Sequence, residues 1–437
     1  MSSKLRNIFL FAVMGALLIS VGFIQSANVA LAIFNLCLIS AIMTLGVNIQ
    51  WGYAGLFNAG VMGFAALGGL AAVVVSFPSV PDAWSVGGPR AILGLGTGVL
   101  GIGLAIFVWR KFPGTRRTRG WAAAVVALGG ITLMRFVIDP AVEAIEAVEP
   151  AKTGFLGGLG LPIVLSWIAG GAFAALAAWG IGKISLGLRS DYLAITTLGI
   201  SEIIIYFLKN EEWMARGVKN VNGLPRPVPY EIDLQQAHWV QELALRVDLN
   251  VVELSSIIVK LSYAGLFIIV LMIVFVLSER ALKSPWGRMM RAIRDNEVAA
   301  SAMGKDVTWR HLQVFVLGSA VIGLAGAMLT TLDGIFTPAS YQPLRFTFLI
   351  WVMVIVGGSG NNLGSILGGF LIWFFWIEAE PIGLALIEFL TSGMATDSAL
   401  RLHLIENAAH TRLATMGVVL LLVLRFSPRG LIPERSQ

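Results

Sequence analysis

Polar side chains lie inside runs of the sequence that are otherwise apolar enough to cross a membrane. Glu202 falls well inside the apolar run 191–208, near the hydroxyl groups of Thr196 and Thr197. Ionisable groups are costly in hydrocarbon, and those that occur there tend to mark a solute pathway. The Glu202 carboxylate could bind an ammonium group or pair with a basic residue of a neighbouring chain, and a structural pairing is at least as consistent with the pattern.

A second polar group surrounds a glycine-containing stretch. Asn48 and Asn58 flank the sequence Gly-Tyr-Ala-Gly at 52–55, and Tyr53 lies within it. Their amide and hydroxyl groups could hydrogen bond to a zwitterion, or they could join helices to one another, as such groups commonly do in membranes. The second interpretation is slightly favoured, and both remain open.

The stretch 52–55 has a counterpart at 357–364, which begins with Gly357 and Gly358 and contains four glycines. Glycine has no Cβ, so both stretches are expected to turn sharply or to let another backbone come close. Interrupted backbone cannot face lipid, and paired interruptions in two parts of a chain point to a transport pathway. Tight helical hairpins or close-packing sites explain the same glycines equally well.

A third pattern is a charged, helix-prone segment between two long apolar runs. The sequence Ser-Pro-Trp-Gly at 284–287 should break the preceding helix, and a glycine suited to a helix end closes the segment at 304. Charged and small residues recur within it at helical spacing. The helix could lie in a groove of a partner protein, or it could be a solvated cytoplasmic helix, which spacing alone slightly favours. The residues concerned are Arg291, Arg294, Asp295, Glu297, Ala299, Ala300 and Gly304.

The elements that carry these residues are predicted to be membrane helices. Of the 437 residues, 57% are hydrophobic and 13% are charged, and the mean hydropathy is +0.82. A water-soluble domain could not cover so much apolar surface. We therefore expect an all-α integral membrane protein: one polytopic bundle over 1–437 with about 10–12 membrane segments, some of them broken or re-entrant. The candidate spans are 7–25, 28–50, 54–76, 91–110, 121–138, 161–182, 191–208, 257–278, 312–332, 346–356, 361–378 and 412–426.

The basic loops predict the orientation of these spans, because cytoplasmic loops are rich in Lys and Arg. Counting crossings from a cytoplasmic N-terminus places every basic loop, and the C-terminus, in the cytoplasm. The opposite face then receives the acidic and mixed-charge segments. The basic loops are 110–119, 183–189, 280–310 and 425–435, and the opposite segments are 139–152, 209–253 and 378–410.

Several function classes are disfavoured by what the sequence lacks. The net charge of +6 arises from loop residues, so nucleic-acid binding is not expected. Cys37 is the only cysteine, and the four histidines show no metal-ligand spacing. No Gly-x-x-x-x-Gly-Lys-Ser/Thr loop is present to hold ATP. A membrane enzyme is the weakest candidate, and Lys260 and Asp333 are expected near helix ends, where their charges can reach water.

Several sequence blocks, taken in order, resemble the branched-chain amino acid permease family of ATP-binding cassette (ABC) transporters, in particular its LivM-like subunits. Residues 291–304 resemble the cytoplasmic coupling loop of ABC permeases. Ala299, Ala300 and Gly304 fit the general coupling signature, but Val298 occupies the place of its glutamate and Glu297 lies one residue earlier. The matching blocks are 48–56, 188–199 with Glu202, 222–224, 284–304, 357–360 and 427–431.

The resemblance implies an ABC importer permease fold and a division of the chain into named parts. Residues 279–310 would form the cytoplasmic coupling loop, and 209–256 an extracytoplasmic segment. The region 100–160 is longer than the family core and is expected to be an inserted helical pair without an assigned function.

The resemblance also implies partners in a bacterial cytoplasmic (inner) membrane, in contact with lipid. These are a homologous second permease (LivH-like), two ABC ATPase subunits that hold ATP and Mg, and an extracytoplasmic substrate-binding protein. The chain itself would bind no cofactor. Branched-chain or other hydrophobic amino acids are the expected cargo, and urea or short amides are the alternative. A secondary transporter or channel would also explain the spans but would leave the charged segment without a role.

Overall fold

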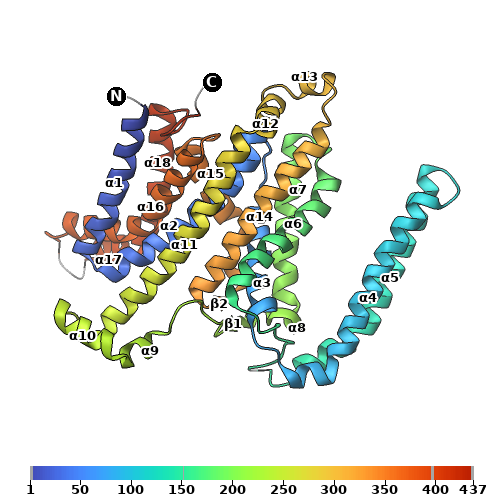
Figure 1. The fold of residues 1–437 in the computed structure, drawn as a ribbon, viewed down its shortest axis with the longest axis horizontal. Helices are drawn as coiled ribbons and strands as arrows, with labels where there is room; N and C mark the ends of the chain where they lie inside the picture. The colour runs from blue at the N-terminus through green and yellow to red at the C-terminus, as the bar shows by residue number, and fades with distance from the viewer. Residues whose placement is uncertain (1–2, 151, 395–397, 435–437) are drawn as a thin grey trace.

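The computed structural model describes residues 3–150, 152–394 and 398–434, and it consists mainly of long helices (Figure 1). Ten of the described helices are long and apolar enough to cross a membrane, and two shorter apolar helices accompany them. Each of the twelve predicted runs overlaps one of these helices, so the predicted fold class is confirmed. The long helices are α1 (Ser3–Ile24), α2 (Ala27–Ala54), α4 (Pro81–Lys111), α5 (Arg116–Glu146), α6 (Ile163–Ser185), α7 (Ser190–Asn210), α11 (Val251–Lys283), α14 (Val307–Asp333), α16 (Asn362–Leu390) and α18 (Thr411–Phe426), which the 3-10 turn η3 (Ala408–His410) precedes; the short ones are α3 (Val61–Ser76) and α15 (Pro343–Gly357).

Helix α2 lies in the middle of the bundle and is buried along most of its length. It packs against α11, α14 and α16, while α3 packs against α6 and α14. A helix that is buried on all sides is expected to be mostly apolar on all sides, and the buried polar residues of α2, such as Asn48 and Gln50, are hydrogen bonded within the protein. Glycines bring the backbones close together: a Cβ at Gly68 of α3 would lie 1.8 Å from the carbonyl oxygen of Gly323 of α14. Such small residues are how membrane helices commonly approach one another.

Helices α4 and α5 form a hairpin that packs along its own length and stands apart from the other helices in Figure 1. Gly101 and Gly130 face each other across the two helices, and a Cβ at Gly101 would lie 2.8 Å from the Gly130 Cα. The pair spans 81–146 and therefore begins before position 100, where the sequence placed the start of an inserted pair. Its status as an insertion stays a prediction.

The short elements gather at two opposite ends of the bundle (Figure 1). Helices α12 (Pro285–Asp295) and α13 (Glu297–Ala302) lie at one end, together with the start of α1, the end of α18 and the tip of the α4–α5 hairpin. The basic loops therefore share one end, as the crossing count requires. The other end holds α8 (Glu212–Ala215), η1 (Gly217–Lys219), α9 (Glu231–Gln236), α10 (His238–Val247), η2 (Pro338–Ser340), α17 (Ala399–Glu406) and the antiparallel pair β1 (Val221–Asn222) and β2 (Ile335–Phe336), in which Val221 faces Phe336.

Candidate functional site

The charged segment folds as two short helices. Asn296 separates them in an extended conformation (φ −155°, ψ 95°), and its side-chain oxygen accepts a hydrogen bond from the Ala299 amide at 2.9 Å. The prediction of one continuous helix to Gly304 was wrong at this point, because an asparagine with this geometry caps the start of a new helix. Gly304 follows the end of α13 with φ +76°, the left-handed conformation expected of a glycine after a helix end.

The residues of α13 project from this end of the bundle (Figure 1). Glu297 and Ala299 are exposed, and Ala300 is half-buried. Val298 and Met303 are 80% and 79% exposed, and the Asp295 side chain is 69% exposed. Exposed apolar side chains beside acidic ones are typical of a surface that contacts another protein.

The two predicted coupling arginines behave differently from these exposed residues, because they turn toward the bundle. Arg291 donates to the carbonyl oxygen of Leu282 at 3.5 Å. Arg294 donates to the carbonyl oxygen of Gly52 in α2 and forms an ion pair with Glu434 at 2.9 Å. Arg294 therefore joins α12 to the last turns of α2 and to the C-terminal segment.

The two glycine interruptions lie against each other although they are about 300 residues apart in sequence. Helix α2 continues through Gly52 and ends at Ala54, so the first break runs from Gly55 (φ 71°) to 60, later than predicted. The second break separates α15 from α16, and Gly358 within it has φ +117°. A Cβ at Gly52 would lie 2.6 Å from the Gly360 nitrogen, so glycine is required for this contact.

Hydrogen bonds between buried side chains hold the two interruptions together. Asn362 of α16 accepts at Oδ1 from the Tyr53 hydroxyl (2.6 Å) and from the Asn48 amide (3.0 Å). Asn48 in turn accepts from the Gly360 amide at 2.8 Å, and Asn362 donates to Glu279 at 2.9 Å. Asn48 and Tyr53 thus make interhelical hydrogen bonds, which is the role the sequence slightly favoured for them.

The loop between α2 and α3 is fixed in a similar way. Asn58 donates to Gln50 at 2.9 Å and accepts from the Gly60 amide at 2.8 Å. The Ala59 amide donates to the hydroxyl of Thr197 in α7 at 3.0 Å. Asn58 is fully buried and Thr197 is 2% exposed, so these groups are paired within the protein.

Glu202 and Thr196 do not join this network. Thr196 is half-buried, and Glu202 lies on the exposed face of α7 beside Ile203 and Tyr206, which are 67% and 72% exposed. Within the described ranges the Glu202 side chain makes no hydrogen bond or ion pair. The predicted pathway residues therefore fall in two separate places.

The C-terminal segment after α18 covers the second interruption, a contact that local sequence patterns did not indicate. The Leu431 and Ile432 amides donate to the carbonyl oxygens of Val356 and Gly357, both at 2.9 Å. A Cβ at Gly358 would lie 2.3 Å from the Ile432 oxygen. Gly357 and Gly358 thus pack beneath this segment.

A cavity of about 450 Å³ lies toward the end opposite α12 and α13, between α2, α3, α14, α15 and α16. The side chains at its mouth, including Asp333 and Ser340, are exposed. Its inner wall is apolar except for hydroxyl groups such as those of Ser40 and Tyr341. Burial raises the pKa of Tyr341, whose hydroxyl shares a 2.7 Å hydrogen bond with Thr330.

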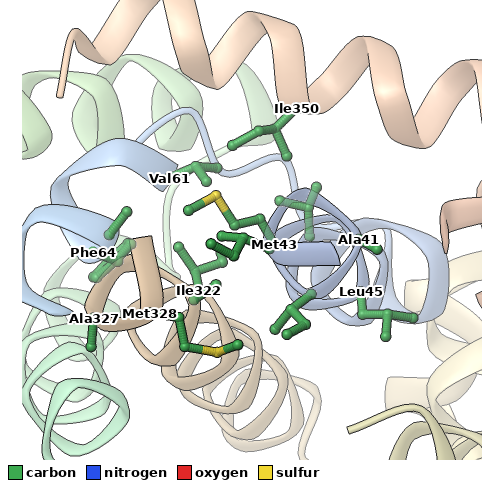
Figure 2. Close-up of a cluster of buried hydrophobic side chains, with 14 of the residues drawn as sticks. Ala41, Met43, Leu45, Val61, Phe64, Ile322, Ala327, Met328 and Ile350 are labelled. Carbon is green, nitrogen blue, oxygen red and sulfur yellow. The ribbon is translucent and has the colours of Figure 1, made fainter. Parts of the chain in front are cut away.

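A packed apolar layer closes the inner end of the cavity. Met43 and Ile350 line the cavity and belong to the main hydrophobic core. Figure 2 shows Met43 reaching from α2 toward Val61 of α3, with Ile322 of α14 beside it. These residues are each less than 5% exposed, so the layer separates the cavity from the hydrogen-bonded interruptions.

None of the predicted pathway residues lines this cavity, and sequence reasoning did not find it. The sequence contained one indication of the cavity, the charge of Asp333 at the end of a long apolar run. From the sequence alone, that charge was explained by the proximity of a helix end to water. No group of three or more His, Cys, Asp or Glu that could hold a metal ion occurs in the part of the chain that the structure describes.

These features define a polytopic helical membrane protein of the permease class. Residues 29–424 match the family model described as "Branched-chain amino acid transport system / permease component", and the chain belongs to this family. The resemblance found in the sequence is therefore confirmed.

Curated relatives agree with the family. The chain is 29% identical to the high-affinity branched-chain amino acid transport system permease protein LivM of Escherichia coli, over 57% of each chain. It is 25% identical to a probable branched-chain amino acid transport permease protein LivM of Methanocaldococcus jannaschii, over 64% of this chain and 70% of that one. The match thus spans little more than half of the E. coli relative. No solved structure is significantly similar to this chain.

Proposed function

We propose that the chain is the membrane-spanning permease subunit of an ABC importer, which translocates branched-chain or other hydrophobic amino acids delivered by a binding protein. The observation that carries this proposal is the cavity of about 450 Å³, which has apolar walls and one carboxylate at its mouth. That volume is in the range of sites for small ligands, and a few polar groups in an apolar pocket are typical of them. The family of the chain supports the same cargo.

The ATPases would bind the exposed surface of α12 and α13, and ATP and Mg would be held on those subunits. Movement of α13 would pass to α12 and, through Arg294, to Gly52 and to the segment containing Glu434. Both interrupted loops are attached to these groups. Closure of the ATPase dimer would thereby open the packed layer beneath the cavity and give alternating access.

The remaining partners would occupy the other surfaces of the bundle. The binding protein would dock at the end that holds α9 and α10, within the segment 209–256. A homologous LivH-like permease would contact the exposed face of α7, where Glu202 would pair with a basic residue of that subunit. The assembly would lie in the bacterial cytoplasmic membrane with both termini in the cytoplasm.

The test is uptake by proteoliposomes that contain this chain with its genomically neighbouring permease, ATPases and binding protein. Radiolabelled leucine should accumulate only when ATP is present on the side of the membrane that faces the ATPases. Urea uptake without leucine uptake would replace the cargo but keep the importer. Uptake by this chain alone, without ATPases, would overturn the proposal in favour of a secondary transporter or channel.

A further inference from the structure

We propose that the carboxylate of Asp333 selects solutes that carry an ammonium group, so that the cavity accepts amino acids and rejects uncharged amides and urea. This inference rests on the proposed transport function and names the class of its substrate. For Asp333, the sequence predicted only a position near a helix end, where its charge can reach water.

The position of Asp333 is set by the end of α14. It is the last residue of that helix, and Gly334 reverses the chain with φ 67°. The side chain is exposed and lines the mouth of the cavity together with Thr337 and Ser340. The carboxylate therefore lies where a solute enters from the end opposite α12 and α13.

Asp333 has no evident structural role at this position. The C-terminus of a helix carries partial negative charge, so a carboxylate there is repelled. Throughout 3–150, 152–394 and 398–434, no hydrogen bond or ion pair to the Asp333 carboxylate is present. Arg226 lies beside Gly334, but it is paired with Glu231 at 2.9 Å. The negative charge is thus unfavourable to the fold and free to act on a ligand.

The rest of the lining makes this charge decisive. Among the described residues, Asp333 is the one charged side chain that lines the cavity. Apolar walls strengthen its field, which attracts a cation into the mouth. An ammonium group at Asp333 would direct an apolar side chain toward Met43, Met62 and Ile350 at the inner end. The carboxylate of an amino acid would remain in the solvent at the open mouth.

An uncharged amide of the same shape would bind poorly. Its N–H groups could donate to the Asp333 carboxylate, but it would displace water from that carboxylate without supplying a positive charge. A charged group that loses water without charge compensation is unfavourable. Selection against solutes that lack a required polar group is larger than selection by apolar contact alone. The carboxylate therefore distinguishes leucine from an amide with the same branched side chain.

The test compares Asp333→Asn, which keeps the side-chain shape, with Ser340→Ala as a matched control at the same mouth. In the reconstituted importer, Asp333→Asn should raise the KM for leucine roughly tenfold or more. Ser340→Ala should stay within about twofold. An unchanged leucine KM in Asp333→Asn would overturn the inference while the importer function stands.

The purified full chain gives a second measurement that does not depend on transport. The amine 3-methylbutylamine should raise its thermal unfolding midpoint, the amide 3-methylbutanamide should not, and Asp333→Asn should remove the difference. Equal stabilisation by both compounds, or none by the amine, would contradict the assigned selectivity. If the amine still stabilises the chain more than the amide does, but the reconstituted complex transports no leucine, the proposed function is overturned and the selectivity of Asp333 stands.

Discussion

Helix α2 passes through two regions that differ in whether their polar groups are paired within the protein. Near its end, Asn48 and Tyr53 are fully buried and each is hydrogen bonded to Asn362 of α16. About two turns earlier, Ser40 lines an apolar cavity whose one charged lining group in the described structure, Asp333, has no partner there. The first region is closed and internally paired, and the second is a cavity with an unpaired charge at its mouth.

The difference shows how polar residues in a membrane protein divide between structure and function. Buried polar groups that pair with each other hold helices together and leave nothing for a solute. An unpaired charge beside a cavity remains available for binding. The Asn362 network therefore joins two interrupted helices, whereas Asp333 and the cavity form the proposed solute site.

The largest expected effect comes from the exposed surface of α13. Replacing Val298 and Met303 together by Asp places charges at two positions that are 80% and 79% exposed, so folding should be unaffected. We expect loss of measurable ATP-dependent uptake because the ATPases no longer dock, while amine binding to the purified chain persists. Co-purification of the ATPases measures docking, and the Val298→Ala, Met303→Ala variant is the control.

Loss of amine binding in the aspartate variant would contradict the separation of the two regions. Retained docking and uptake would instead contradict the assignment of α13 to the ATPase contact.

Asn362→Leu should give the largest loss of stability. It removes the acceptor of the buried Asn48 amide, and a buried donor left unsatisfied costs about 1–3 kcal/mol. It also leaves the Tyr53 hydroxyl with only its longer, 3.3 Å contact to the Ser278 carbonyl oxygen among the described residues. Unfolding of the purified chain by denaturant in detergent measures the free energy. Asn210→Leu is the control, since the Asn210 side chain is exposed and donates to the Tyr206 carbonyl oxygen of its own helix. Equal losses in both variants would show that the network does not fasten the interruptions.

Arg294→Glu should reduce uptake about tenfold or more, because a charge-assisted hydrogen bond contributes about 1.5–3 kcal/mol. The substitution separates α12 from Gly52 and repels Glu434. ATP hydrolysis should continue without matching transport, and adding Glu434→Arg should restore part of the uptake. No recovery in the double variant would contradict transmission through this ion pair.

Ser40→Leu should have the smallest effect, confined to the cavity. The added side chain narrows the wall, so the KM for leucine should rise by roughly threefold and the KM for alanine by less. Ser262→Leu serves as the control, since Ser262 is in α11 and does not line the cavity. An equal rise in the KM values for leucine and alanine would argue against solute binding at this wall.

The helices could be predicted from the sequence because their cause is local. A long apolar run in a membrane must satisfy its own backbone, and only a helix does so within one segment. Local patterns also identified Gly304 as a helix end. They failed at Asn296, because an asparagine within a helix-prone run was not taken as a cap, and they placed the first interruption at Gly52 rather than at Gly55.

The candidate site could not be predicted to the same degree, because its contacts are distant in sequence. The partner of Asn48 is 314 residues away, and the C-terminal segment that covers Gly358 is also remote from both. Residues of α2, α3, α14, α15 and α16 line the cavity, so no single run of the sequence could predict it. Asp333 was visible in the sequence, but its lack of a partner becomes evident only in three dimensions.

The most direct test of the two-region account is thiol labelling from each side of the membrane. The single cysteine, Cys37, is buried and would be replaced by Ala, and Ser340→Cys, Asn58→Cys and Ser301→Cys would be introduced separately.

A membrane-impermeant maleimide should modify Ser340→Cys only from the extracytoplasmic side, with protection by leucine and none by urea. It should modify Ser301→Cys in α13 only from the cytoplasmic side, and it should leave Asn58→Cys unmodified. Labelling of Asn58→Cys with protection by leucine, and no protection at Ser340→Cys, would place the solute in the hydrogen-bonded region and contradict the account.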